Sequence, residues 1–316
     1  MKTRISLECR RLGMDSLRLL SVSLFVIGLP TCVAAQAAGG QKTFAKPSDG
    51  VKALVAAARA GDQAELLAVL GPGSKDLIES GDPIADKKGL QGFVKSYDAK
   101  HSLTVTAPGY VTLIVGASDW PMPIPLVRDG TSWYFDSAQG RDEVINRRIG
   151  ENELGAIAVC EGYYRAQKEY AAKGHDGMPA GLYAQKFASD PGKHNGLYWE
   201  VAAGKPQSPM GPAVAEAAAE GYGGGGPEPY HGYIYKRLNS QGADANGGAK
   251  SYIVNGKQAG GFALIAYPAK YGTSGIMTFI VNQEGVIFQK DLGDNTETAA
   301  RAIATFNPDQ SWTVVE

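Results

Sequence analysis

Few side chains in this sequence have both the type and the spacing that catalysis requires. His231 follows Tyr230 at the start of a predicted strand, and a histidine beside a carboxylate can accept and return a proton near neutral pH. Glu228 and Asp291 are the carboxylates that we consider as its partner. The simpler interpretation is a strand-end histidine bonded to backbone. We therefore keep His231, Glu228 and Asp291 as weak catalytic candidates and favour a chain without catalytic residues.

The sequence also offers little for metal or thiol chemistry. Its other histidines lack the close spacing of zinc ligands, and they are His101, His175 and His194. Cys160 lies on the apolar side of a predicted helix, where a buried thiol is a poor nucleophile. The acidic residues after Asp291 do not have EF-hand spacing and are typical of helix capping. We predict no metal site and no cofactor.

Aromatic side chains are better candidates for binding. Tyr and Trp are enriched where proteins hold other proteins, so Tyr230 and Tyr233 are candidate contacts for a partner. Trp120 and Trp133 would line the mouth of a cone-shaped sheet, where a small apolar ligand can bind. Packing in the core is the alternative for all four residues.

Composition and charge exclude several classes of protein. The chain has 31 basic and 32 acidic residues and is 44% hydrophobic. This composition excludes a disordered chain and a strongly cationic nucleic-acid binder. At about 100–200 residues per domain, 316 residues predict two domains.

The amino-terminal segment has the pattern of a secretory signal peptide. Basic residues precede an apolar run at 19–29, and small residues follow, which predicts cleavage after Ala35 or Ala37, with Met14 as an alternative start. The run is shorter than the roughly 20 residues that cross a bilayer. Lipid attachment at Cys32 is a competing interpretation. We predict an exported protein, periplasmic or extracellular, without a transmembrane segment in its mature chain.

A first α+β domain is predicted at 46–137, after a flexible leader at 36–45. Apolar residues at helical spacing predict a first helix. Asp62 with Glu65 three residues later matches a capping box and predicts a second, and a third is expected at 90–99. Residues of alternating polarity then predict strands at 103–106, 110–115, 124–128 and 132–136, the last two joined by a turn at 129–130.

A second domain is predicted at 138–316. It begins with a long helix at 138–172, because apolar residues recur at helical spacing from Ile145 to Tyr163. A loop-rich insertion follows at 174–229 and contains one short helix. The expected antiparallel sheet is formed by strands at 231–238, 261–267, 276–281 and 286–290, with a helix at 296–304 and an edge strand at 312–315.

Four segments resemble the DUF2950 family of exported bacterial proteins, whose function is not known. They are WPMPIPLV (120–127), NRRIGENEL (146–154), PYHGY (229–233) and MTFIVNQEGV (277–286). No catalytic residue is assigned to this family, so the resemblance carries no chemistry over to this chain. In shape, the first domain is similar to NTF2-like cones and the second to pseudopilin heads, although no prepilin segment precedes its helix.

Three functions follow from these observations. The leading hypothesis is a non-catalytic module for binding or assembly in the cell envelope, whose partner is an envelope protein or a small ligand. One alternative is a periplasmic hydrolase that acts on an envelope polymer through His231. The other is a carrier that holds a small apolar ligand in the N-terminal cone.

Overall fold

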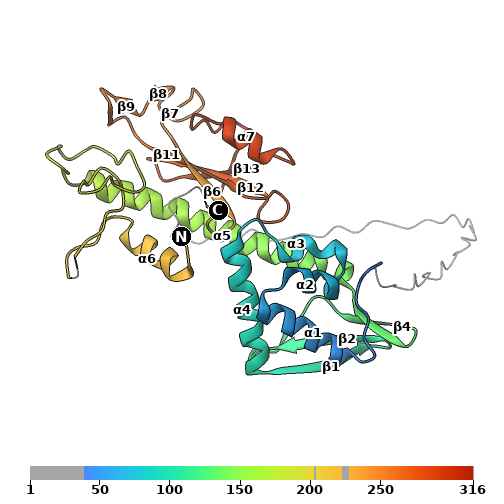
Figure 1. The fold of residues 1–316 in the computed structure, drawn as a ribbon. Coiled ribbons are helices and arrows are strands. Elements are labelled where there is room, and N and C mark those ends of the chain that lie inside the picture. Colours follow the sequence, from blue (N-terminus) through green and yellow to red (C-terminus); the bar gives the residue numbers. More distant parts are fainter. Residues whose placement is uncertain (1–38, 203, 223–227, 316) are drawn as a thin grey trace, which may run out of the picture. The chain divides into compact units, whose positions relative to one another are not determined.

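The computed structural model describes residues 39–202, 204–222 and 228–315 (Figure 1). The predicted signal peptide and Cys32 lie outside these residues. Helices and antiparallel sheets both contribute to the fold, so the predicted α+β class is confirmed. The domain boundary at residue 137 and the likeness to NTF2-like cones and pseudopilin heads stay predictions. None of the helices in the described ranges combines the length and the apolar character that crossing a membrane requires.

Short helices make up the first part of the chain. They are α1 (Pro47–Ala60), α2 (Gln63–Leu70), the 3-10 turn η1 (Pro72–Ser74), α3 (Lys75–Ile78) and α4 (Pro83–Ala99). Asp62 caps α2 as predicted, because its carboxylate accepts the backbone N–H of Glu65 at 3.0 Å. Helix α4 begins seven residues before the predicted start. Asp82 accepts from the backbone N–H of Ala85 at 3.0 Å, and Pro83 at the first helical position favours initiation there.

These helices pack on a five-stranded antiparallel sheet. Its strands are β1 (His101–Ala107), β2 (Tyr110–Val115), β3 (Trp120–Pro121), β4 (Leu126–Asp129) and β5 (Ser132–Phe135). The order is β1-β2-β4-β5, with β3 paired to β2. Burial alternates along β2, and its buried Leu113 meets Leu54 of α1 and Leu66 of α2 in one apolar core. The predicted β4–β5 turn is present, with Gly130 at φ 58°.

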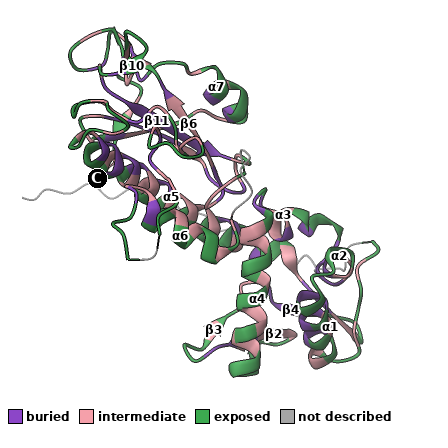
Figure 2. Cartoon of the chain, turned by 60° about the vertical axis from the view of Figure 1, so that its left-hand side comes forward, coloured by how far each residue is buried: buried purple, intermediate pink, exposed green. Residues whose placement is uncertain are grey.

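The long helix is continuous. Helix α5 (Ser137–Ala171) has 35 residues and passes through Gly150 without interruption. Its buried side follows the predicted stripe at Ile145, Cys160 and Tyr163. Figure 2 shows buried and exposed residues alternating along α5. Ile149, which belongs to the same stripe, is only half-buried. One helix therefore supplies side chains to the core around α1 and, farther along, to the core of the second sheet.

The second sheet has the antiparallel order β14-β13-β12-β11-β6. Its strands are β6 (Tyr233–Leu238), β11 (Ala263–Pro268), β12 (Met277–Asn282), β13 (Ile287–Asp291) and β14 (Thr313–Val314). Every residue of β11 is buried, because Leu264 faces a core shared with α5 while Ile265 faces a core shared with α7 (Thr296–Ala302). All five strands were predicted within about two residues at most ends, a usual error for strand boundaries.

The region between β6 and β11 was not predicted in detail. It contains two small ribbons, β7 (Ser240–Gln241) with β8 (Lys250–Ser251) and β9 (Ile253–Val254) with β10 (Lys257–Gln258). Two-residue strands carry no periodic signal. The short helix expected in the insertion is α6 (Gly211–Glu220). Helix α7 begins where predicted, but the side chain of Asn295 makes no capping bond.

Candidate functional site

A cavity of about 540 Å³ lies among the helices of the first part of the chain and the first half of α5. This volume is within the roughly 300–1,000 Å³ of typical small-molecule sites. The cavity is open to solvent and mainly apolar. Its lining residues are Leu54, Ala58, Leu66, Leu70, Leu77, Ile78, Ser80, Ala85, Asp86, Gly89, Leu90, Phe93, Trp120, Met122, Pro123, Ile124, Val144, Arg147, Arg148, Glu151 and Asn152.

One face of α4 forms a wall of this cavity. Asp86, Leu90 and Phe93 are spaced by three or four residues and therefore lie on one side of the helix. No residue of α4 is assigned to the buried core, and Leu90 and Phe93 are half-buried. The apolar side of α4 thus borders an open space that the side chains of the neighbouring helices do not fill.

The opposite wall is more strongly apolar. Leu54, Leu66 and Ile124 are buried members of the core that also reach the cavity. Trp120 lines the cavity from β3, as the sequence suggested for a wall residue. The Arg147 guanidinium lies 5.6 Å from the centre of the Trp120 ring, within the range of a cation–π contact. Trp133 is not part of the lining, and its backbone pairs with Phe44 instead.

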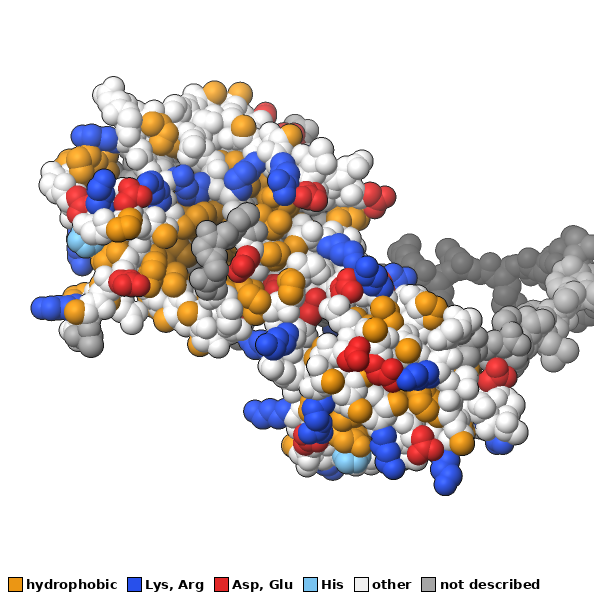
Figure 3. Space-filling view, in the orientation of Figure 1, with side chains coloured by type: hydrophobic (Ala, Val, Ile, Leu, Met, Phe, Trp, Pro, Cys, Tyr) orange, Lys and Arg blue, Asp and Glu red, His pale blue; other side chains and the backbone are white. Residues whose placement is uncertain are grey.

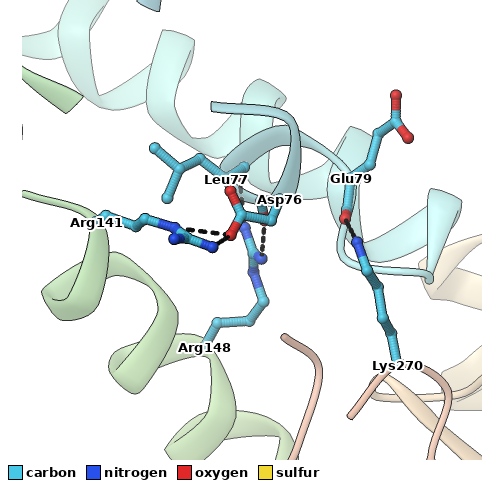
Figure 4. Close-up of polar contacts among 6 residues, drawn as sticks. All are labelled: Asp76, Leu77, Glu79, Arg141, Arg148 and Lys270. Carbon is cyan, nitrogen blue, oxygen red and sulfur yellow. Dashed lines mark hydrogen bonds and ion pairs between the residues drawn. The ribbon is translucent and has the colours of Figure 1, made fainter. Parts of the chain in front are cut away.

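The charged end of the cavity is built around Arg148. Its Nη1 donates to the carbonyl oxygen of Asp76 at 2.7 Å, and its Nη2 donates to the carbonyl oxygen of Leu77 at 2.6 Å (Figure 4). Burial lowers the pKa of Arg148. The Asp76 carboxylate accepts a hydrogen bond from Arg141, with 2.8 Å between Arg141 Nε and Asp76 Oδ2. Arg148 is therefore held by neutral carbonyls and forms no ion pair with a described carboxylate.

Asp86 is the acidic group of the same end. Both of its carboxylate oxygens accept from the backbone N–H of Ser80, at 3.2 and 3.0 Å. Burial raises the pKa of Asp86, against the opposing effect of the Ser80 bond and of the Arg148 charge. The loop between α3 and α4 is thus tied to both sides of the cavity, and Lys270 also donates to the Glu79 carbonyl in this loop at 3.4 Å.

The three catalytic candidates are not brought together by the fold. No hydrogen bond between the His231 ring and a carboxylate occurs in the described ranges. His231 has a left-handed backbone, φ 51°, and its ring lies 4.1 Å from that of Tyr230. Glu228 is exposed. Asp291 accepts from Tyr271 Oη at 3.2 Å and from the Gly293 N–H at 2.8 Å.

The two tyrosine candidates differ in accessibility. Tyr233 is completely buried, and its hydroxyl donates to the Met277 carbonyl at 2.9 Å, so it offers no surface to a partner in this structure. Tyr230 is half-buried and packs edge-on against Tyr222, with ring centres 4.9 Å apart. Tyr230 alone of this pair is reachable from solvent.

One histidine–carboxylate pair was not anticipated. His194 Nδ1 lies 2.9 Å from Asp176 Oδ1, and the His194 backbone N–H donates to the other oxygen at 2.6 Å. These bonds lower the pKa of Asp176. In the described chain no hydroxyl or thiol is hydrogen-bonded to the His194 ring, and the Trp199 ring lies 4.7 Å away. The pair joins two parts of the insertion, and Tyr170 of α5 donates to the His194 carbonyl at 2.6 Å.

Thiol and metal chemistry find no support in the described residues. Cys160 is completely buried, and burial raises its pKa to about 12, so its thiolate is not formed near neutral pH. Within the described ranges, no three His, Cys, Asp or Glu side chains are grouped closely enough to hold a metal ion. Charged side chains of both signs are interspersed with apolar ones on the face drawn in Figure 3.

Comparison with known proteins gives one match. A family model described as "Protein of unknown function (DUF2950)" matches residues 41–315. No curated protein and no solved structure matches the chain.

Proposed function

The chain belongs to the DUF2950 family, to which no function is assigned. On the evidence of the cavity, we propose that it is a non-catalytic protein and that it binds a small, mainly apolar molecule. The predicted export would make this a binding function of the cell envelope. The observation that carries the proposal is the open cavity of about 540 Å³ between α4 and α5.

The composition of the cavity walls supports binding. Apolar side chains that reach open solvent lose the hydrophobic stabilisation that burial would give, roughly 25 cal/mol for each Å². A bound apolar molecule would recover it by covering Leu90, Phe93 and Trp120, which are only half-buried. The few polar groups at one end would fix the orientation of such a molecule, as in most small-molecule sites.

The alternative of an envelope hydrolase has less support. A general base needs a partner that orients it, and no such partner for His231 is found in the described ranges. In the pair His194–Asp176 the carboxylate orients the imidazole. However, no described hydroxyl or thiol is hydrogen-bonded to that ring, and neither residue lines the cavity. A role in envelope assembly stays a hypothesis without a specific surface.

Two glycines of α4 provide a matched test. Gly89 lines the cavity, and a Cβ at this position would meet no atom within 4 Å. Gly92, three residues later, is equally free of neighbours but does not line the cavity. Gly89→Phe should therefore fill the cavity mouth, whereas Gly92→Phe should place the same ring in solvent. Both substitutions also remove a glycine that weakens the helix.

Binding would be measured with N-phenyl-1-naphthylamine, a neutral apolar fluorophore, added to the purified protein. We expect saturable binding of one probe to the wild type and to Gly92→Phe. Gly89→Phe should lower the affinity at least about tenfold, or about 1.4 kcal/mol, because its ring occupies space that the probe needs. Unchanged binding in Gly89→Phe, or no saturable binding in the wild type, would overturn the proposal.

A further inference from the structure

We infer that the molecule held in the cavity is an amphiphile with one carboxylate, and that Arg148 binds this carboxylate. The inference rests on the proposed function, because it assigns a chemical class to the ligand of the same cavity. It depends on how the charged groups at that end are already satisfied.

Arg148 retains donors that the protein does not use. A guanidinium has five N–H groups, and Arg148 uses one Nη1 and one Nη2 bond for the carbonyls of Asp76 and Leu77. The two short bonds fix the position of its planar group, and the side chain lines the cavity. The remaining N–H groups are thus available in a fixed orientation, which suits the two oxygens of a carboxylate.

The Asp76 carboxylate gives its Oδ2 to Arg141 and forms no ion pair with Arg148, although its charge still acts on Arg148. Arg141, about two helical turns earlier on α5, binds Oδ2 of the Asp76 side chain (Figure 4). Arg147 pairs with Glu143 through Nε and Oε1 at 2.5 Å and covers Trp120. Of the two arginines in the lining, Arg148 is therefore the one whose positive charge lacks an ion pair with a described residue.

The acidic lining residues compete less well for a cationic ligand. Asp86 directs both oxygens to the Ser80 N–H, so this carboxylate is already engaged. Glu151 is exposed to solvent, where water and salt screen its charge. A guanidinium, in contrast, keeps its charge at all physiological pH values. The partly buried end of the cavity thus favours a negative head group.

The rest of the ligand is specified by the opposite wall. Leu54, Leu66 and Phe93 surround the space beyond Arg148 with aliphatic and aromatic carbon. A carboxylate on a small head would lie at α5, and an aliphatic or aromatic body would extend between α1, α2 and α4. This combination describes free monocarboxylic acids of medium chain length.

The test compares three molecules with the same chain: decanoic acid, decanol and decylamine. Each would displace N-phenyl-1-naphthylamine from the wild-type protein at neutral pH, below the concentration at which it aggregates. We expect the acid to bind at least about tenfold more tightly than the alcohol, since hydrogen bonds between charged groups are stronger than neutral ones. The amine should bind most weakly.

Variants of α5 identify the group responsible. Arg148→Met should give the acid and the alcohol equal affinities. Arg148→Lys should keep part of the preference for the acid, since lysine retains the positive charge but not the planar guanidinium that binds both carboxylate oxygens. Arg165→Met is the matched control, because Arg165 lies on α5 outside the lining and pairs with Glu161, and the preference should persist. If Arg148→Met does not fold, the preference for the acid over the alcohol is compared between the wild type and Arg148→Lys, and a smaller preference in Arg148→Lys supports the assignment.

The outcomes separate the two proposals. Equal affinity of the acid and the alcohol for the wild type, tighter binding of the amine, or an unchanged preference in Arg148→Met would overturn the assignment to carboxylates but leave the apolar cavity as a binding site. Failure of all three molecules and of the fluorophore to bind would overturn the proposed function as well.

Discussion

At the scale of single residues, Asp86 shows how the cavity affects stability. Burial is the largest influence on this carboxyl and raises its pKa above the unfolded value. The folded protein therefore holds the Asp86 proton more tightly than the unfolded chain does. The resulting stabilisation is complete below the unfolded pKa of about 3.9 and is lost as the pH rises through the folded pKa.

The variant Asp86→Asn tests this pH dependence. Asparagine retains an acceptor for the Ser80 N–H and has no charge to bury. We expect the variant to gain stability relative to the wild type as the pH rises from about 4 to neutral. Urea unfolding at both pH values, followed by circular dichroism, measures the difference. A wild-type advantage that grows toward neutral pH would contradict the expectation and would point to the charge interaction with Arg148 as the larger effect.

Cys160 provides a second prediction at the residue scale. Its side chain is completely buried, and burial raises its pKa to about 12. We therefore expect no reaction with Ellman's reagent in the folded protein at neutral pH and a full reaction after unfolding in guanidinium chloride. Cys160→Ser should lower the free energy of unfolding by about 1–3 kcal/mol, since it buries a hydroxyl among apolar groups. Rapid labelling of the native protein would show that α5 opens locally.

At the scale of elements, α5 contains two glycines with opposite surroundings. A Cβ at Gly140 would lie 2.5 Å from the carbonyl oxygen of Pro123, whereas a Cβ at Gly150 would meet no atom within 4 Å. We expect Gly140→Ala to destabilise the protein by about 1–3 kcal/mol, because backbone must move. Gly150→Ala should stabilise it by up to about 1 kcal/mol through helix propensity. The denaturant midpoints of Gly140→Ala and Gly150→Ala would be measured beside the wild type. Midpoints that both rise or both fall would contradict the expectation.

The elements themselves were largely predictable, because their signals are local. Asp62 with Glu65, Gly130 in its hairpin and the stripe around Cys160 each depend on a few neighbouring residues, and each is found in the structure. The start of α4 at Pro83 was missed, although Asp82 is a strong capping signal. Between Pro83 and Leu90 the apolar side chains are Ile84 and Ala85 alone, so the apolar pattern is weak in this part of the helix.

The candidate site was much less predictable than the elements. Trp120 was identified as a possible wall residue, but nothing near Arg148 in the sequence indicates that its guanidinium meets two carbonyls some 70 positions earlier. The spacing of Asp86, Leu90 and Phe93 defines a helical face and does not reveal whether the opposite wall fills the space in front of it. A cavity is a property of tertiary packing, which periodicity alone does not specify.

At the scale of the whole molecule, two features link the first part of the chain with the second. Helix α5 packs Val144 against the core around α1 and contributes Ala156 and Cys160 to the core of the second sheet. Asp82 is also buried and accepts from Tyr222 Oη at 2.8 Å and from the Gly232 N–H at 3.1 Å. Residues that are 140 and 150 positions apart thus depend on one carboxylate.

These links predict that both sheets unfold together. Removal of the Asp82 carboxylate would leave the Gly232 N–H buried and unpaired, which costs about 1–3 kcal/mol. It would also uncap α4, which costs about 0.5–2 kcal/mol. We expect one calorimetric transition for the wild type and a lower, broader or divided transition for Asp82→Ala. Tyr222→Phe removes only one of the bonds and should lower the free energy of unfolding by about 1 kcal/mol without dividing the transition. Two well-separated transitions in the wild type would instead indicate that α5 transmits little stability between the sheets and that the two parts fold as independent domains.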